Sequence, residues 1–527
     1  MAVIEIFLNF VPTKLIKMKK LLLSIAMLLL TTGLWAQYRN PIIPGYHPDP
    51  SICRVGDDFY LVNSSFQYFP GVPLYHSKDL VNWELMGNVL DRESQLLLRG
   101  TNSWLGIYAP TIRYNDGTYY MITTNVGNGG NFMVTAQDPQ GPWSEPIWLK
   151  QGGIDPSLWF ENGKCYMVSN PDVGIWLCEI DTKTGEQLTE SKLLWRGTGG
   201  RHPEGPHIYK KDGWYYLLIS EGGTELAHKL TIARSRDIYG PYESNPANPI
   251  LTNCNMKGQS KQIQGTGHGD FVQATDGSWW IVFLAYRNFG GSYHHLGRET
   301  CLAPVEWKAG EWPVVNGGEA IDTLMEVKTL PQVAVKPKVT YYDFKEPFGP
   351  EWVWLQNPIM ANYQRKDGRL WLTPHGSLTD NNRPTFVGMR QETPRILVET
   401  EVDAATLGAG CEAGLTVYQI TDGHFDLSVI RFLDGRMVVS QKCQAKSLLS
   451  GKMEPLEKGD KVRLRITSDG EMYHFAYAAG DGVFHTIASH NCSMVSTEVV
   501  GGFTGVTIGM FADGADGASF GYFRIEN

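Results

Sequence analysis

The sequence is poor in charged residues and has no cluster of basic ones. Lys, Arg, Asp and Glu make up 19% of its 527 residues, and 46 basic against 55 acidic residues give a net charge of −9 at pH 7. Nucleic acids and anionic membranes attract proteins through concentrated positive charge. Neither is therefore expected as a partner. The dense glycine and proline also disfavour a helical bundle.

The sequence also lacks paired-cysteine motifs and nucleotide-binding motifs. The eight cysteines include no C-x-x-C pair, the spacing typical of zinc sites and thioredoxin-like redox centres. No P-loop occurs, and no G-x-G-x-x-G lies between a strand and a helix, so no organic cofactor is expected. Most cysteines are expected to act as buried hydrophobic residues.

An apolar run lies near the N-terminus. Lys19 and Lys20 precede it, it covers 21–30, and Ala36 offers a small residue for cleavage. This order predicts a signal peptide over 1–36, with 1–17 as an upstream extension, and a periplasmic or secreted mature protein. The run is short for a membrane span, which disfavours the alternative of an uncleaved anchor. The first cysteine, Cys53, lies too far from the cleavage point for a lipid anchor.

Glycine and aromatic residues are abundant and recur in a fivefold repeat. Each copy is a short strand, a Gly-containing turn and an aromatic-rich strand, which indicates a β-hairpin. The copies begin at Asp49, Ala109, Asp155, Glu204 and His268. Their average spacing of about 55 residues fits four-stranded propeller blades. The pattern predicts an all-β fold that begins with a five-bladed β-propeller over 37–325.

The residues that begin the repeats are expected to meet. In a propeller the innermost strand of every blade lines the central channel, so equivalent positions converge. Asp49, Asp155 and Glu204 place three carboxylates there. Asp before Pro is also common in turns, which leaves a structural interpretation open for either aspartate alone. Glu has little turn preference, so the coincidence of all three favours a functional site.

A second domain follows the repeats. Residues 326–339 contain prolines and lysines without a clear period and are interpreted as an interdomain linker. From 340 to 527, alternating strands separated by Asp-Gly turns predict an antiparallel β-sandwich. This half shows no acidic constellation of its own.

Gathered carboxylates suit glycosidic bond cleavage. They repel one another, so at least one should hold a proton near neutral pH. A protonated carboxyl can protonate the leaving oxygen while an ionised one attacks or activates water. Positions across a channel favour the wider spacing of an inverting enzyme, roughly 6.5–9.5 Å. Aromatic candidates for packing on a sugar ring are Phe66, Tyr68, Trp104, Tyr108 and Phe132.

Three segments resemble the signature segments of glycoside hydrolase family 43. They are HPDPS at 47–51, IDPS at 154–157 and HPEGP at 202–206. SFQYFPGVP at 65–73 and GTGHG at 265–269 extend the resemblance, and the C-terminal half resembles the concanavalin-like sandwich of the family's β-xylosidases. The resemblance implies that Asp49 is the general base and Glu204 the general acid. Asp155 would keep the pKa of Glu204 raised and orient it.

The resemblance also implies binding residues. Arg298 would hold sugar hydroxyls, although a structural ion pair is the alternative, and Phe503 would reach from the sandwich over the propeller, although ordinary packing is the alternative. His268 would lie beside a calcium ion or water cluster as a water-mediated metal site, unless it is a hydrogen-bonded core histidine. The candidate substrate-binding residues are Phe66, Tyr108, Ala109, Arg298 and Phe503.

One position departs from the family's β-xylosidase pattern. Tyr108 stands where typical members carry Trp, and the segment GIYAPTI at 106–112 resembles the branch that includes α-L-arabinofuranosidases. The two pentoses present similar hydroxyl patterns, so the choice between them stays open, with arabinose slightly favoured.

The leading hypothesis is an exo-acting, inverting glycoside hydrolase. It would release terminal α-L-arabinofuranosyl or β-D-xylosyl residues from plant hemicellulose (arabinoxylan, xylan, arabinan) or derived oligosaccharides. The expected partner is this oligosaccharide or polysaccharide, without membrane insertion after signal cleavage. One alternative is a non-catalytic carbohydrate-binding propeller, which predicts loss of one of the three carboxylates. Another is a transglycosylase or lyase, which a water-activating Asp49 disfavours.

Overall fold

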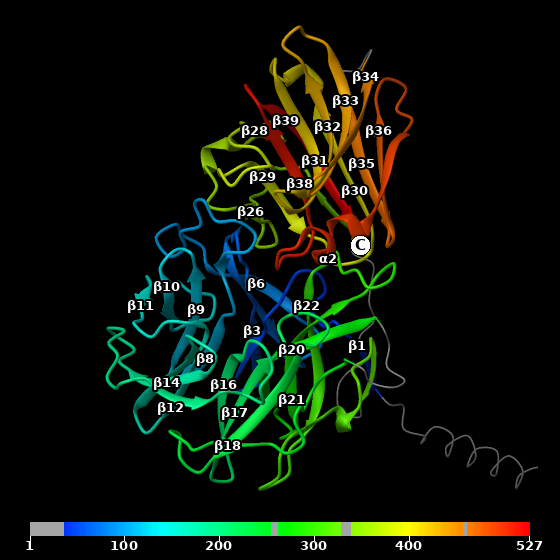
Figure 1. Cartoon of the computed structure of the whole chain (residues 1–527). Coiled ribbons are helices and arrows are strands. Elements are labelled where there is room, and N and C mark those ends of the chain that lie inside the picture. Colours follow the sequence, from blue (N-terminus) through cyan, green and yellow to red (C-terminus); the bar gives the residue numbers. More distant parts are fainter. Residues whose placement is uncertain (1–35, 255–261, 328–338, 457–460) are drawn as a thin grey trace, which may run out of the picture.

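The computed structural model describes residues 36–254, 262–327, 339–456 and 461–527. Nearly all its regular structure is β-strand, in an N-terminal domain coloured blue to green and a C-terminal domain coloured yellow to red (Figure 1). The predicted signal peptide lies outside these ranges, apart from Ala36. Within them, no helix is long and apolar enough to cross a bilayer.

Five antiparallel sheets build the N-terminal domain. In chain order they contain β2 (Ser51–Val55), β3 (Asp58–Val62), β5 (Gly71–Ser77) and β6 (Glu84–Leu90); β7 (Gly106–Ile107), β8 (Thr111–Asn115), β9 (Thr118–Val126), β10 (Gly130–Ala136) and β11 (Ile147–Trp148); β12 (Ile154–Glu161), β13 (Lys164–Asn170), β14 (Ile175–Ile180) and β15 (Lys192–Trp195); β16 (Glu204–Lys211), β17 (Trp214–Glu221), β18 (Lys229–Ser235) and β19 (Glu243–Ser244); and β20 (Ile263–Gln273), β21 (Trp279–Arg287), β22 (Arg298–Glu306) and β23 (Val314–Val315). A 3-10 turn, η1 (Asn316–Gly318), follows the last sheet.

The first strands of the sheets form a closed ring. β2 contacts β8, β8 contacts β12, β12 contacts β16, β16 contacts β20, and β20 returns to β2. The five sheets are therefore the blades of a propeller, as the repeat predicts. The two ends of the propeller chain are joined, because β1 (Ala36–Arg39) pairs antiparallel with β24 (Leu324–Val327).

The hairpins of the blades depend on local turn chemistry. Two-residue turns match the twist of antiparallel strands when both residues have positive φ, which favours Asp-Gly and Asn-Gly. Three blades use such turns between their first two strands, at Asp116-Gly117, Asn162-Gly163 and Asp212-Gly213. The repeated turn dipeptides in the sequence are thus the hairpin corners.

The predicted propeller boundary at 325 lies at the last described strand that pairs with the propeller domain. It falls inside β24, and the backbone of this strand is paired with the start of the chain up to Val327. Composition alone could not show this pairing, because the partner strand lies almost 300 residues away. Of the rest of the predicted linker, 328–338 lies outside the described ranges, and Val339 is already the first residue of β25.

The C-terminal domain is a sandwich of two antiparallel sheets. One contains β25 (Val339–Tyr342), β27 (Tyr363–Lys366), β28 (Arg369–Leu372), β39 (Ala518–Glu526), β30 (Arg395–Asp403), β35 (Lys461–Asp469), β36 (Met472–Ala478) and β37 (His485–Asn491). The other contains β29 (Thr385–Arg390), β38 (Thr507–Asp513), β31 (Cys411–Ile420), β32 (Gly423–Arg431), β33 (Met437–Ala445) and β34 (Leu448–Pro455). Short helical turns are η2 (Met360–Asn362), η3 (Ala404–Thr406), η4 (Cys492–Val495) and α2 (Thr497–Val500). Alternate residues of both sheets form one apolar core between them.

The two domains share backbone hydrogen bonds and a core. β26 (Trp354–Leu355) of the sandwich half pairs with β4 (Tyr68–Phe69) of the propeller. Asn357 is buried at this junction, where it accepts from the Leu98 N–H at 2.6 Å and donates to the Leu96 carbonyl at 2.8 Å. The sandwich is therefore positioned directly against one blade of the propeller.

The cysteines behave as predicted. All eight are free, and seven of them are buried. They contribute to the apolar cores rather than to cross-links.

Candidate active site

The predicted carboxylates lie where the backbone is forced out of regular strand geometry. Asp49 and Asp155 both have φ of 53°, and His268 has φ of 42°. Strand pairing is irregular around Asp155, between Ile154 and Ser157, and around His268. Left-handed backbone costs a non-glycine residue roughly 1–3 kcal/mol, and such strain clusters at functional sites. Bulges at Asp155 and His268 redirect the side chains of two different blades, and Asp49 lies just before β2 of a third.

Side chains from three repeats converge on His268. Its Nδ1 lies 3.8 Å from Asp49 Oδ1 and 3.9 Å from Asp155 Oδ2. The N–H of Gly205, next to Glu204, donates to Asp155 Oδ2 at 3.2 Å. Gly205 has φ of 59°, and a Cβ there would lie only 3.0 Å from the imidazole. Glycine is thus required for the fourth blade to approach the other two.

Asp49 is held in its ionised form. Burial alone would raise its pKa, but the charge of Arg298 and a hydrogen bond from Ser64 act in the opposite direction, and the pKa lies below the ordinary value. The guanidinium of Arg298 lies 2.9 Å from Asp49 Oδ1, and the Ser64 hydroxyl donates to Oδ2. Asp49 can therefore accept a proton at neutral pH.

Glu204 and Asp155 have the opposite electrostatics. Burial and the charge of Asp49 raise the pKa of Glu204 to about 7. Burial, with the charges of Glu204 and Asp49, also raises the pKa of Asp155 well above its usual range. No donor in the described part of the chain hydrogen-bonds to the Glu204 carboxyl. The arrangement therefore places an ionised carboxylate beside a pair of carboxyls that retain a proton.

The surroundings of His268 do not form a calcium cage. Calcium prefers six to eight oxygen ligands. Asp270, the nearest further carboxylate in sequence, is occupied by an ion pair with Arg113 at 2.7 Å and a hydrogen bond from Tyr209 at 2.6 Å. Within the described ranges, no three His, Cys, Asp or Glu side chains gather as a metal site. Burial lowers the pKa of His268, so the ring is neutral.

Arg298 and Phe503 join the sandwich to the site. Arg298 donates to Thr224 Oγ1 at 3.2 Å and to the backbone carbonyl of Phe503 at 3.3 Å, in addition to its bond with Asp49. The Phe503 ring lies 5.8 Å from that of Phe66 and 4.9 Å from that of Trp104, centre to centre. Arg298 therefore forms the ion pair that was the structural alternative for it, and its partner is Asp49 itself. The predicted contacts of Arg298 and Phe503 with a sugar stay predictions.

The other aromatic candidates divide into two groups. Tyr108 lies 5.0 Å from Phe66, centre to centre, and its hydroxyl donates to the Trp104 carbonyl. Ala109 is buried beside it, after β7. Tyr68 is fully buried in the apolar cluster beneath this group. Phe132 does not belong to the site; it is wrongly placed near the channel, because β10 is the third strand of its blade and directs Phe132 into the blade core.

The sequence reasoning missed three polar residues. Ser64 and Thr224 contact Asp49 and Arg298 as described, and Ser220 accepts from the backbone N–H of His268 at 2.5 Å. Ser64 lies just after β3 and Ser220 near the end of β17, and each of these is the second strand of a repeat. Comparison of second strands between repeats could have suggested them, whereas Thr224 lies in a loop outside the repeat.

Two family models match the chain. Glycosyl hydrolases family 43 covers residues 38–313, and the β-xylosidase C-terminal concanavalin A-like domain covers 342–526. The chain therefore belongs to glycosyl hydrolase family 43 and is a glycoside hydrolase.

Named relatives resemble the chain over both domains. A non-reducing end α-L-arabinofuranosidase of Bacteroides ovatus is 41% identical, over 93% of this chain and 96% of its own. A xylosidase/arabinosidase of Butyrivibrio fibrisolvens is 39% identical, over 92% of this chain and 99% of its own. A solved Bacteroides ovatus structure, described as xyloglucan PUL GH43B, superimposes with a TM-score of 0.88 at 40% identity, over 93% of this chain and 99% of that one.

Proposed function

We propose that the enzyme removes single non-reducing terminal pentoses, α-L-arabinofuranosyl or β-D-xylosyl, from hemicellulose or its oligosaccharides with inversion. The observation that carries the proposal is the contrast between Asp49, whose pKa is lowered, and Glu204, whose pKa is raised to about 7. Hydrolysis of a glycosidic bond, whether inverting or retaining, needs one carboxyl of each kind, and inversion is proposed because Asp49 and Glu204 come from different blades of the ring. The names of the arabinofuranosidase and xylosidase/arabinosidase relatives support the pentose, and Tyr108 favours arabinofuranose.

Bond cleavage follows from the two protonation states. Asp49 takes a proton from water, whose oxygen forms a bond to the anomeric carbon. The bond from that carbon to the leaving oxygen breaks on the opposite face, and Glu204 gives its proton to this oxygen. The product sugar has the inverted anomeric configuration. After cleavage Asp49 is protonated and Glu204 is ionised. Proton exchange with solvent restores both groups for the next cycle.

Asp155 acts through Glu204 rather than on the sugar. Its position beside the Gly205 N–H fixes the backbone next to the acid. The two buried carboxyls repel when both are ionised, which helps to retain the proton that Glu204 must donate.

The sandwich explains the exo action. The segment that carries Phe503 packs on Phe66, Trp104 and Tyr108, and its carbonyl is bonded to Arg298. A chain that continued past the terminal sugar on this side would meet the sandwich. Only a chain end fits such an arrangement.

A calcium ion in the channel stays a separate proposal. Few protein oxygen atoms around His268 are free to coordinate such an ion, so most of its ligands would be water molecules. No step of the reaction requires it. Dialysis against a chelator should leave kcat unchanged, and a calcium-restorable loss would instead show that the ion matters.

Export is proposed from the predicted signal peptide. The prediction is that the mature protein begins at Gln37 and is recovered from the periplasm or medium. N-terminal sequencing of the native protein tests it; a protein retained with 1–36 attached would contradict it.

The pentose assignment is tested by side-by-side initial rates. We measure 4-nitrophenol release from the α-L-arabinofuranoside and the β-D-xyloside, with Asp49→Ala as the blank for contaminating activity. Release above the blank, with the arabinofuranoside preferred, is expected. No release from either, together with binding of arabinoxylan fragments left intact over days, would favour the carbohydrate-binding propeller instead.

A further inference from the structure

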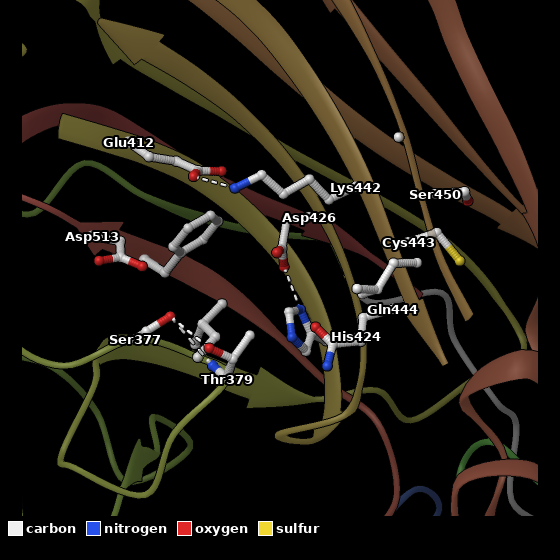
Figure 2. Close-up of a pocket in the computed structure, with 14 residues that line it drawn as sticks. Ser377, Thr379, Glu412, His424, Asp426, Lys442, Cys443, Gln444, Ser450 and Asp513 are labelled. Atoms are coloured by element: carbon white, nitrogen blue, oxygen red, sulfur yellow. Dashed lines mark hydrogen bonds and ion pairs between the residues drawn. The ribbon is translucent and has the colours of Figure 1, made fainter. Parts of the chain in front are cut away.

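The sandwich has a cavity of its own, away from the carboxylates. It measures about 360 Å³, a size typical of small-molecule sites, which start at roughly 300 Å³. Its lining comes from residues between 377 and 513, so no propeller residue takes part. Figure 2 shows the loop with Ser377 and Thr379 on one side and the strands with Glu412, Asp426 and Lys442 on the other.

Most of the charge in this cavity is neutralised internally. Lys442 pairs with Glu412, and His424 Nδ1 lies 2.9 Å from Asp426 Oδ1. Asp513 has no ion-pair partner among the residues described. Such a surface has little attraction for an ion, but its carboxylate oxygens and the Lys442 ammonium can still accept from and donate to hydroxyl groups.

His424 directs an unused polar atom into the cavity. The residue is 3% exposed, and its Nε2 has no hydrogen-bond partner, while its Nδ1 is committed to Asp426. In Figure 2 the ring lies between Asp426 and the Ser377–Thr379 loop. Buried polar atoms without a partner are rare in native proteins, and each calls for an explanation. Because this atom is buried, a hydroxyl group bound in the cavity would supply the missing partner once the neighbouring lining side chains shift slightly.

Apolar surface lies beside these polar groups. Phe511 lines the cavity, and Leu449, on the edge strand β34, lines it as well although its side chain is 71% exposed. An aromatic face and an aliphatic rim next to hydroxyl-binding groups match the two kinds of surface of a sugar ring. A small inorganic ion of either sign would not use the apolar part.

We propose that this cavity is a second, non-catalytic saccharide site, which binds internal units of a neutral polysaccharide. That the ligand is a saccharide is inferred from the chemistry of the cavity alone. That the saccharide is a hemicellulose rests on the proposed function. Such a site would hold the enzyme on the polymer while the propeller removes chain ends.

The strand β34 offers a matched pair of variants. Leu449 is paired with Gln444, another lining residue, whereas Leu448 is paired with Ala445 and faces the other side of the sheet. Both leucines are exposed, Leu448 at 51%, so neither truncation should disturb folding. Thr379→Trp, at an exposed lining position, fills the cavity from the loop side.

The test is native affinity electrophoresis of the full chain in gels that contain arabinoxylan, xyloglucan or arabinan. All variants carry Asp49→Ala, so the polymer is not consumed. Chain ends are scarce in a long polymer, so retardation reports binding to internal units. We expect Leu449→Ala to weaken retardation roughly tenfold, given the apolar surface that it removes. Thr379→Trp should abolish retardation, and Leu448→Ala should match the parent.

Two results would overturn the proposal. Equal retardation of parent, Leu449→Ala and Thr379→Trp in all three polymers would mean that the cavity binds none of them. Mobility changes of both leucine variants in gels without polymer would indicate an interface between copies of the chain along β34. In the Asp49-intact background, Leu449→Ala should hydrolyse 4-nitrophenyl glycosides at the parent rate. Failure of that hydrolysis in the parent would count against the proposed function alone, since retardation needs no catalysis.

Discussion

At the residue scale, three carboxylates in similar backbone positions have different acidities because their neighbours differ. Asp49 has Arg298, Ser64 and His268 within reach of its oxygens. Glu204 has no cation in hydrogen-bonding contact and lies near the charge of Asp49. The repeat sets where the three carboxylates lie. The residues that surround each carboxylate set its acidity.

The pH dependence of kcat/KM should show this difference. Activity requires protonated Glu204, so it should fall as pH rises through about 7. It also requires ionised Asp49, whose pKa is lowered, so the midpoint of the loss on the acidic side should lie below the ordinary aspartate value of about 3.9. A pH profile on a good substrate measures both limbs. A maximum above pH 8 would contradict the assignment of Glu204 as the acid.

Glu204→Gln should affect substrates according to their leaving groups. The amide cannot donate a proton to the leaving oxygen, so hydrolysis of natural linkages should fall by roughly 10²–10⁴-fold. A 2,4-dinitrophenyl glycoside needs little protonation and should lose much less. The matched control is Glu243→Gln, in an exposed ion pair with Arg234, which should leave both rates unchanged. Equal losses on both substrates would refute the acid role.

At the element scale, a short sandwich segment controls how closely Phe503 approaches the propeller. Gly505 packs against the backbone of Leu296 and Gly297, and a Cβ at Gly505 would lie 2.1 Å from the Leu296 carbonyl oxygen. Backbone that close cannot accommodate a side chain without moving. The segment's position therefore depends on glycine at this point.

Gly505→Ala should displace the segment and weaken substrate binding. Phe503 and its bond to Arg298 would move away, so KM should rise about tenfold with a smaller change in kcat. Gly87→Ala is the control, because Gly87 lies in β6 with open space around its Cβ position. Steady-state kinetics of both variants test this; an unchanged KM for Gly505→Ala would mean that the segment does not shape the site.

At the scale of the whole molecule, the two domains should unfold together. Asn357 is buried between them, and its side chain satisfies two backbone groups of the propeller. Asn357→Ala leaves both groups unpaired and should lower the free energy of unfolding by about 3 kcal/mol. Calorimetry should show one transition at a lower temperature.

Asn88→Ala supplies the control for this prediction. Asn88 also bridges the domains, to the Pro350 carbonyl at 3.2 Å, but its bond is exposed and should contribute little. Two separate transitions, of which Asn357→Ala shifts only one, would contradict the shared unfolding.

Much of this architecture is predictable from the sequence because it repeats. The Asp-Gly and Asn-Gly corners mark the hairpins, and the equivalent positions of Asp49, Asp155 and Glu204 follow from the ring. Contacts between distant segments do not repeat. The pairing of β24 with β1, the Thr224 bond to Arg298 and the sandwich cavity depend on folded geometry, so no local pattern could have indicated them.

Water activated by Asp49 attacks in a single displacement, and proton NMR of the first-formed sugar reveals whether it does. The enzyme is mixed at high concentration with an aryl pentoside, and the anomeric proton signals are followed before mutarotation equilibrates them. We expect the first sugar released to have the configuration opposite to that of the substrate. A first product with retained configuration would contradict it, because retention requires a carboxylate to attack the sugar instead of water.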